Sequence, residues 1–272
     1  MSSSDSMAAG TVEAKVAAER WAALEANPEV LTSLCHQLGV APTFQVVDVF
    51  GLEPDLLGFV PQPALALILL FPSKPRDDEA RVTSVAEHEV SPRVYYLTQL
   101  RGHLDNACGT IAILHSVLNN RDILGLSGDP GCVGERFYQQ TRELGHDERG
   151  KCLDTFQDIV TLHNKLVGEG QSRVVESNQV DKYFWQVRIS VFIIYLTLSW
   201  QVRHHFVSIT AVEGHLVELD GAYNSGPNVI RKLEAGQDFL SAAAEFVKEK
   251  YISKSGQEAQ FALMALVMGH GD

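Results

Sequence analysis

Residues 205–221 read HFVSITAVEGHLVELDG, and this stretch decides how the chain is expected to fold. Two runs rich in β-branched and apolar residues flank the turn signal Glu213-Gly214, a pattern that predicts an antiparallel β-hairpin. Positions 205 and 220 then fall almost opposite each other on neighbouring strands. We therefore expect the side chains of His205 and Asp220 to come within reach of each other.

Outside the hairpin, helical and strand patterns alternate without a strict repeat. Asn27-Pro28 reads as a capped helix start and Gly39 as its end, and the apolar run 64–71 predicts a strand buried on both faces. The other expected elements are strands at 43–50 and 260–267, helices at 54–57, 108–118, 134–144, 153–166 and 238–251, and loops at 72–92 and 168–178. The pattern favours an α/β or α+β fold in which helices flank a sheet rich in antiparallel strands.

The composition limits the class of protein. With 272 residues, of which 45% are hydrophobic, the chain is long enough for one domain with a full core. Its 34 acidic and 22 basic residues give a formal net charge of -12. This charge disfavours nucleic acid or an anionic membrane surface as a partner, and it favours a basic protein.

The cysteine pattern and the start of the chain point to a reducing compartment. No secretory signal precedes the four cysteines, and their spacing with histidines is not of the zinc type, so we expect free thiols and no metal site. Residues 1–19 read as a disordered extension, and residues 20–272 as one domain. The apolar run 189–200 is shorter than the ~20 residues that span a bilayer. We expect a monomer in the cytoplasm, and also in the nucleus, without a membrane anchor.

Cys108 is the strongest candidate for chemistry. It lies where a predicted helix begins, and a helix amino terminus favours a thiolate because its exposed N–H groups and dipole attract negative charge. If the hairpin meets this helix, His205 can take the thiol proton and Asp220 can orient the imidazole ring. The three residues would then form the catalytic site of a thiol hydrolase.

Each of these residues, taken singly, also has a structural interpretation. A free cysteine is usually a small buried hydrophobic residue, and Asp220 could be a turn residue. His205 could be an ordinary surface or core histidine, and its neighbour His204 competes with it for the role of base. Three further cysteines have no obvious base beside them and are interpreted as structural, namely Cys35, Cys132 and Cys152.

Three motifs together resemble one known family. The run 106–111, NACGTI, with His115 and the pair Asn119-Asn120 after it, closely resembles the nucleophile motif of the ubiquitin carboxyl-terminal hydrolases. The stretch 20–31, RWAALEANPEVL, is similar to the opening of the short cytosolic members of that family. The segment 205–221 is similar to the histidine and aspartate motif of the family, so the resemblance covers most of the chain.

The resemblance implies a papain-like thiol hydrolase on a knotted α/β fold. Its substrate would be ubiquitin, cleaved after the carboxyl-terminal glycine to release small adducts or peptides. The resemblance assigns Cys108 as nucleophile, His205 as general base and acid, and Asp220 as the residue that orients His205. It implies no cofactor, and it implies a crossover loop at about residues 167–180 that limits the size of the leaving group.

The chain departs from the family pattern just before the nucleophile. Family members place a glutamine six residues before the cysteine, where its amide helps to stabilise the oxyanion, and this position is Gly102 in the chain. The nearest candidate is Gln99, so Leu100 to Leu104 holds about three extra residues. Gln99 is expected to keep the oxyanion role only if these residues loop out.

A larger departure lies at residues 183–204, where the family runs directly into the histidine motif. These residues are mostly apolar and are foreign to the polar stretch before them, and their removal restores the motif. We therefore hypothesise that they are translated intron or an error of gene modelling. Mass-spectrometric detection of intact peptides across this segment would refute the hypothesis.

Several functions remain open at the level of sequence. The first is a deubiquitinating hydrolase. The second is a ubiquitin-binding protein with impaired or absent catalysis, since both insertions lie beside catalytic positions. A third keeps the cysteine chemistry but acts on a ubiquitin-like modifier, and a bare interaction scaffold is the most distant reading.

Overall fold

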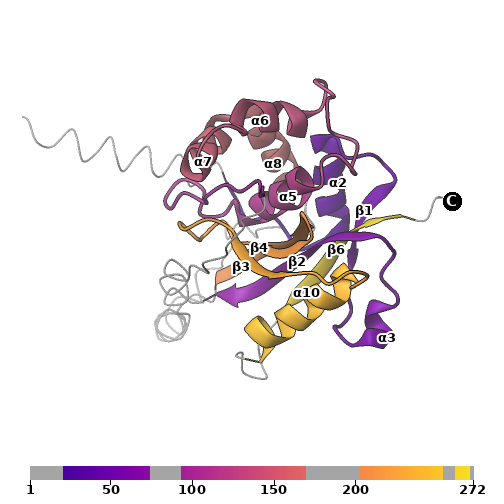
Figure 1. Cartoon of the computed structure of the whole chain (residues 1–272). Helices are drawn as coiled ribbons and strands as arrows, with labels where there is room; N and C mark the ends of the chain where they lie inside the picture. The colour runs from indigo at the N-terminus through magenta and orange to yellow at the C-terminus, as the bar shows by residue number, and fades with distance from the viewer. Residues whose placement is uncertain (1–20, 74–92, 170–202, 254–260, 270–272) are drawn as a thin grey trace, which may run out of the picture.

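The computed structural model describes residues 21–73, 93–169, 203–253 and 261–269, which form one central sheet with helices on both faces (Figure 1). The helices are α2 (Pro28–Leu38), α3 (Pro54–Leu57), α5 (Cys108–Asn119), α6 (Val133–Thr141), α7 (His146–Thr155), α8 (Gln157–Glu169) and α10 (Phe239–Val247), and the π-helical turn η1 (Lys248–Ile252) follows α10. The strands are β1 (Phe44–Asp48), β2 (Ala64–Ser73), β3 (Arg203–Val212), β4 (His215–Leu219), β5 (Asn228–Lys232) and β6 (Ala262–Met268).

The six strands pair antiparallel in the order β1-β6-β2-β3-β4-β5. The predicted hairpin is confirmed, because β3 and β4 pair from Val212 opposite His215 to Ser208 opposite Leu219. On its other side β3 pairs with β2, where His205 lies opposite Phe71 and Arg203 opposite Ser73. Strand β3 therefore lies in the interior of the sheet, with a neighbour on each side.

Two hydrophobic cores cover the two faces of the sheet. Alternate residues of β2 point to opposite faces: Ile68 packs with α2 and α5 on one side, and Leu67 and Leu69 pack with α10 on the other. Figure 1 shows α10 on one face and the helices α2, α5, α6, α7 and α8 on the opposite face. The prediction that residues 64–71 form a doubly buried strand is confirmed, because the sheet is covered on both sides.

Local sequence explains where the first helix begins and ends. The Asn27 side chain accepts hydrogen bonds from the backbone N–H groups of Glu29 and Val30, at 2.8 and 3.4 Å, and Pro28 occupies the first helical position. Gly39 ends the helix with a φ of 109°, a left-handed conformation that favours glycine. These three predictions are confirmed.

Some predicted elements differ from the observed ones. The single helix expected at 153–166 is two helices, α7 and α8, because Phe156 between them leaves the helical conformation with a ψ of 92° and packs its ring against Phe137. The polar first turns of α7 lack an apolar period and escaped the prediction. Strand β5 was not predicted either. The helix expected to run to Tyr251 ends at Val247 and continues as the π-helical turn.

Several predictions fall on segments outside the described residues. They concern the extension 1–19, most of the loop 72–92, the crossover loop beyond residue 169, and the insertion up to residue 202. The knotted path depends on the connections 74–92 and 170–202 and stays a prediction. No helix within the described ranges is long and apolar enough to cross a membrane.

Candidate active site

The hairpin brings the side chains of His205 and Asp220 together. Asp220 directly follows the last residue of β4, and His205 lies near the start of β3, so the register makes the two residues diagonal neighbours. The His205 Nε2 atom donates to the Asp220 Oδ1 atom at 2.6 Å. Both residues are buried, with 9% of His205 and none of Asp220 exposed. The predicted pairing of these two side chains is confirmed.

The electrostatics of the pair favour a charged imidazole. Burial alone would lower the pKa of His205, since an imidazolium loses its hydration. The charge of Asp220, its hydrogen bond, and a hydrogen bond to Cys108 outweigh burial and raise the pKa of His205 to about 10. The ring is therefore protonated at neutral pH and can accompany a thiolate as its counter-charge.

Cys108 is the first residue of α5, and its side chain hydrogen-bonds to His205. Since Nε2 of His205 donates to Asp220, Nδ1 is the nitrogen that can exchange a proton with the thiol. Helix α5 packs directly on β3, which explains how a helix and a hairpin far apart in the sequence meet. No side chain caps α5 at its N-cap residue Ala107, so its first N–H groups are not taken up by a capping side chain.

Gly109 lets the start of α5 approach β3 closely. A Cβ atom at this position would lie 3.2 Å from the Leu24 Cβ atom and 3.3 Å from the ring of Phe206, the residue next to His205. A side chain would therefore push the helix start away from the strand. The glycine after Cys108 thus has a packing role that brings the thiol and the imidazole together.

The backbone around Asp220 is also tied down. The Ala222 N–H donates to Asp220 Oδ1 at 2.9 Å, and the backbone N–H of Gln99 donates to the Gly221 carbonyl at 2.7 Å. A Cβ atom at Gly221 would lie 3.0 Å from the Ile111 Cγ2 atom on α5. The turn after β4 therefore packs on the helix that carries Cys108. Sequence reasoning missed Gly221, although a glycine directly after Asp220 is a visible sign of close packing.

The extra residues before Cys108 form a turn of their own. The Leu100 carbonyl accepts from the N–H groups of His103 and Leu104, so the segment loops out as the Gln99 hypothesis required. The Gln99 side-chain amide, however, donates to the Leu104 carbonyl at 2.8 Å and the Asp105 carbonyl at 2.9 Å. In this arrangement the amide supports the loop, and an oxyanion could recruit it only by replacing one of these carbonyls.

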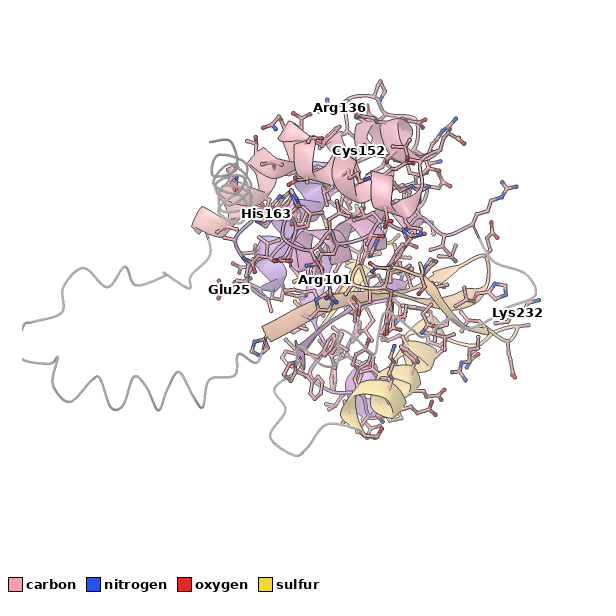
Figure 2. The ribbon with its side chains drawn as sticks, turned by 90° about the vertical axis from the view of Figure 1, so that its left-hand side faces the viewer. Glu25, Arg101, Arg136, Cys152, His163 and Lys232 are labelled. Atoms are coloured by element: carbon pink, nitrogen blue, oxygen red, sulfur yellow. The ribbon has the colours of Figure 1, made fainter. Side chains whose placement is uncertain are left out.

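The competing residues take structural places. His204 is exposed, and as the neighbour of His205 on β3 it points to the opposite face of the strand, so it does not compete for the thiol. Cys35 is fully buried, and burial raises its pKa to about 12. The Cys132 thiol donates to Asp129 at 3.2 Å, and burial and this carboxylate raise its pKa. Cys152 lies half-buried in the helical layer (Figure 2).

A thiol at a helix start, an imidazole and a buried carboxylate, meeting on an antiparallel sheet, define a papain-like thiol hydrolase. The family model of ubiquitin carboxyl-terminal hydrolases, family 1, matches residues 21–252, and the chain belongs to this family.

Individual relatives agree with this assignment. The chain is 34% identical over 250 residues to ubiquitin carboxyl-terminal hydrolase isozyme L1 of Monodelphis domestica, a match that covers 89% of the chain and 96% of the relative. It is 32% identical to a ubiquitin carboxyl-terminal hydrolase of Drosophila melanogaster, with 90% and 96% covered. Its fold is similar to that of the UCH37 catalytic domain of Trichinella spiralis, solved bound to ubiquitin vinyl methyl ester, with a TM-score of 0.65, 23% identity, and 91% and 95% covered.

Proposed function

We propose that the chain hydrolyses the bond after the carboxyl-terminal glycine of ubiquitin and releases small adducts or peptides, with Cys108 as nucleophile. The observation that carries the proposal is the line of three side chains, in which His205 bonds to buried Asp220 and interacts with Cys108. Membership of the hydrolase family supports ubiquitin as the substrate. Cys108, His205 and Asp220 each have a separate role in the reaction.

The proposed reaction has two halves. The Cys108 thiolate attacks the carbonyl carbon after the glycine, and the bond to the leaving group breaks as the His205 imidazolium gives it a proton. Water then attacks the thioester carbon while His205 takes its proton, and the bond to sulfur breaks, which frees the ubiquitin carboxyl group and restores the Cys108 thiolate beside the imidazolium. Asp220 keeps its contact with Nε2 of His205 in both halves, so Nδ1 stays aimed at the sulfur.

The oxyanion formed in each half needs donors. The backbone N–H of Cys108 belongs to the first turn of α5, where N–H groups have no intrahelical partner. Gln99 is our proposal for the second donor, and its role requires that the amide exchange one loop carbonyl for the oxyanion. This exchange is the step at which the chain would differ from a relative without extra residues.

An electrophilic ubiquitin probe tests the proposal directly. The unaltered protein should form a covalent adduct, and Cys108→Ala should form none. Cys152→Ala is the matched control, because Cys152 lies in the helical layer, and it should be captured like the unaltered protein. Adduct formation by Cys108→Ala, or none by the unaltered protein despite tight ubiquitin binding, would overturn the proposal.

The engaged Gln99 amide keeps one other candidate open, a ubiquitin-binding protein with impaired catalysis. Turnover of a ubiquitin conjugate with a fluorescent leaving group separates the two, since the binding protein would form little product at saturating substrate. A parallel assay with conjugates of ubiquitin-like modifiers decides whether ubiquitin is the preferred substrate. A monomeric state and a cytoplasmic location stay predictions, which sedimentation and imaging would check.

A further inference from the structure

The turn that carries Asp220 is held by the side chain of Tyr96. Tyr96 is 2% exposed, and its hydroxyl donates to the backbone carbonyls of Asp220 and of Tyr223, the second at 2.6 Å. A hydroxyl has a single proton, so the two carbonyls share it, and the tyrosine oxygen links the two ends of the turn.

The Tyr96 hydroxyl is protonated at neutral pH and well above it, so it is a donor there. Burial raises its pKa far above the usual range, and the nearby charges of Asp220, Tyr223 and Glu218 raise it further. The hydroxyl therefore does not ionise next to the Asp220 carboxylate.

The ring of Tyr96 is itself fixed in place. It stacks on the His115 ring at 5.0 Å between ring centroids with an interplanar angle of 13°. The Nε2 atom of His115 accepts from the Leu97 N–H at 3.1 Å, which leaves Nδ1 as the protonated nitrogen that donates to the Leu219 carbonyl at 3.3 Å. Leu219 directly precedes Asp220, so His115 and Tyr96 hold the main chain before and after the carboxylate.

We propose that Tyr96 is a positioning residue of the hydrolysis, whose hydroxyl fixes the main chain of Asp220 so that the carboxylate stays on Nε2 of His205. The inference rests on the proposed function for its consequence in turnover. Its structural part stands on the two hydrogen bonds from the Tyr96 oxygen and on the stacking against His115.

The physical consequence follows from the short contact between Asp220 and His205. Burial lowers the pKa of His205, and this 2.6 Å contact, together with the interaction with Cys108, outweighs burial and keeps the imidazole charged. A small displacement of the Asp220 backbone would lengthen the contact, and the imidazolium would lose stabilisation. A purely structural hydroxyl, by contrast, would stabilise the fold without changing the proton affinity of His205.

Tyr96→Phe tests the inference because it removes only the hydroxyl. Its matched control is Tyr95→Phe, which removes the buried hydroxyl of the neighbouring residue, hydrogen-bonded at 2.7 Å to Thr141 and not to the Asp220 turn. The first measurement is the titration of His205 by NMR of ring-labelled protein, assigned with His205→Gln. This measurement needs no ubiquitin, so it tests whether the Tyr96 hydroxyl positions Asp220 even if the proposed function fails.

We expect Tyr96→Phe to lower the midpoint of the His205 titration by about half to one pH unit, the effect of losing one buried hydrogen bond. The kcat for a ubiquitin conjugate should fall about threefold to tenfold with KM almost unchanged, because Tyr96 acts through Asp220 and not on the substrate. Tyr95→Phe should leave both the midpoint and kcat as in the unaltered protein.

A double variant tests whether Tyr96 affects turnover through Asp220. In the Asp220→Asn background, Tyr96→Phe should reduce kcat no further, since the two changes act through one interaction. An unchanged titration in Tyr96→Phe, an equal shift in Tyr95→Phe, or an independent loss of kcat in the double variant would each overturn the inference. If the unaltered protein neither hydrolyses ubiquitin conjugates nor reacts with the probe, the proposed function fails. The His205 titration still decides whether the Tyr96 hydroxyl positions Asp220.

Discussion

The two halves of the site reach their positions by different means. The hairpin side, made of β3, β4 and the Asp220 turn, sets His205 against Asp220 through the register of one local strand pair. The nucleophile side, made of the lead-in 99–107 and α5, reaches the site only through long-range packing of α5 on β3. The first geometry is determined by backbone ladders, whereas the second depends on side chains that fit together. Changes to the two sides should therefore have different signatures.

The largest effect is expected on the hairpin side, from Asp220→Asn. The amide keeps the size of the carboxylate but removes the charge that raises the pKa of His205 to about 10. We expect kcat/KM for a ubiquitin conjugate to fall by about 10²- to 10⁴-fold, as when a triad loses its carboxylate. A loss below about tenfold would mean that the register alone positions the imidazole.

The same change has a signature in stability at alkaline pH. Because the folded-state pKa of His205 lies above its usual 6.5, the stabilisation is complete below about pH 6.5 and is lost as pH rises through about 10. The free energy of unfolding should therefore decline over this interval in the unaltered protein. Denaturant titrations should show a weaker decline in Asp220→Asn, and an identical decline would contradict the assigned charge.

Two buried histidines, His115 and His163, link α5 to neighbouring elements, and both respond to acid. His115 of α5 bonds to the Leu219 carbonyl on the hairpin side, and His163 of α8 bonds to Thr110 of α5 at 2.8 Å (Figure 2 labels His163). Burial lowers the pKa of both to about 4, so the unfolded chain binds more protons between pH 6.5 and 4. The free energy of unfolding should therefore decrease as pH is lowered from 6.5 to 4, by on the order of 3 kcal/mol for each histidine.

Single variants show which of these two contacts of α5 carries the acid sensitivity. His115→Gln and His163→Gln should each remove about half of the acid-dependent part of the unfolding free energy, measured by denaturant titration at several pH values. A slope that survives both changes would place the acid sensitivity elsewhere in the chain.

A smaller effect is expected on the nucleophile side, from Gln99→Ala. The change removes the donors to the Leu104 and Asp105 carbonyls and the proposed oxyanion donor. We expect kcat to fall by about 10- to 10²-fold, with little change in KM. Gln139→Ala is the control, because that amide donates to Glu135 away from the site. Unchanged turnover in Gln99→Ala would remove Gln99 from the proposed mechanism.

The smallest effect concerns the contact between the two sides. In Gly221→Ala, the new methyl group would press on Ile111 of α5 and on Gln99, at 3.0 and 3.2 Å. We expect a loss of about 1 kcal/mol of stability and a modest fall in kcat. Gly168→Ala on α8 meets no atom within 4 Å and should be neutral or slightly stabilising. Thermal unfolding of both variants checks the comparison.

Sequence was a good guide wherever the determining interactions are local. The Asn27 cap, the Gly39 stop and the Glu213-Gly214 turn each act within a few residues, and each predicted feature is present. The pairing of His205 with Asp220 followed from the turn alone, because strand register converts a turn position into a distance. Cys108 at the start of α5 was predicted from its motif.

The parts that escaped prediction depend on contacts between distant segments. Neither Tyr96 nor His115 has a sequence signal for Asp220, since their bonds reach the turn across more than a hundred residues of chain. The interruption at Phe156 is set by packing on Phe137, which no local pattern records. Strand β5 is defined by its antiparallel pairing with β4, and its five residues, NVIRK, are too short an alternating pattern to predict a strand by themselves.

The pairing of Ser73 with Arg203 has a consequence for chain length. Strand β2 ends at Ser73, directly opposite Arg203, where β3 begins. The connections at 74–92 and 170–202 therefore join the sheet at neighbouring positions, and Arg203 is two residues from the catalytic base His205. Arg203 and His204, which were counted with the apolar insertion, already belong to this anchored pair. Since the entropy of closing a loop grows only with the logarithm of its length, each doubling costs roughly 0.6 kcal/mol. The length of chain that joins the sheet at Ser73 and Arg203 can therefore vary at a small cost in free energy, while the His205 ring keeps its orientation.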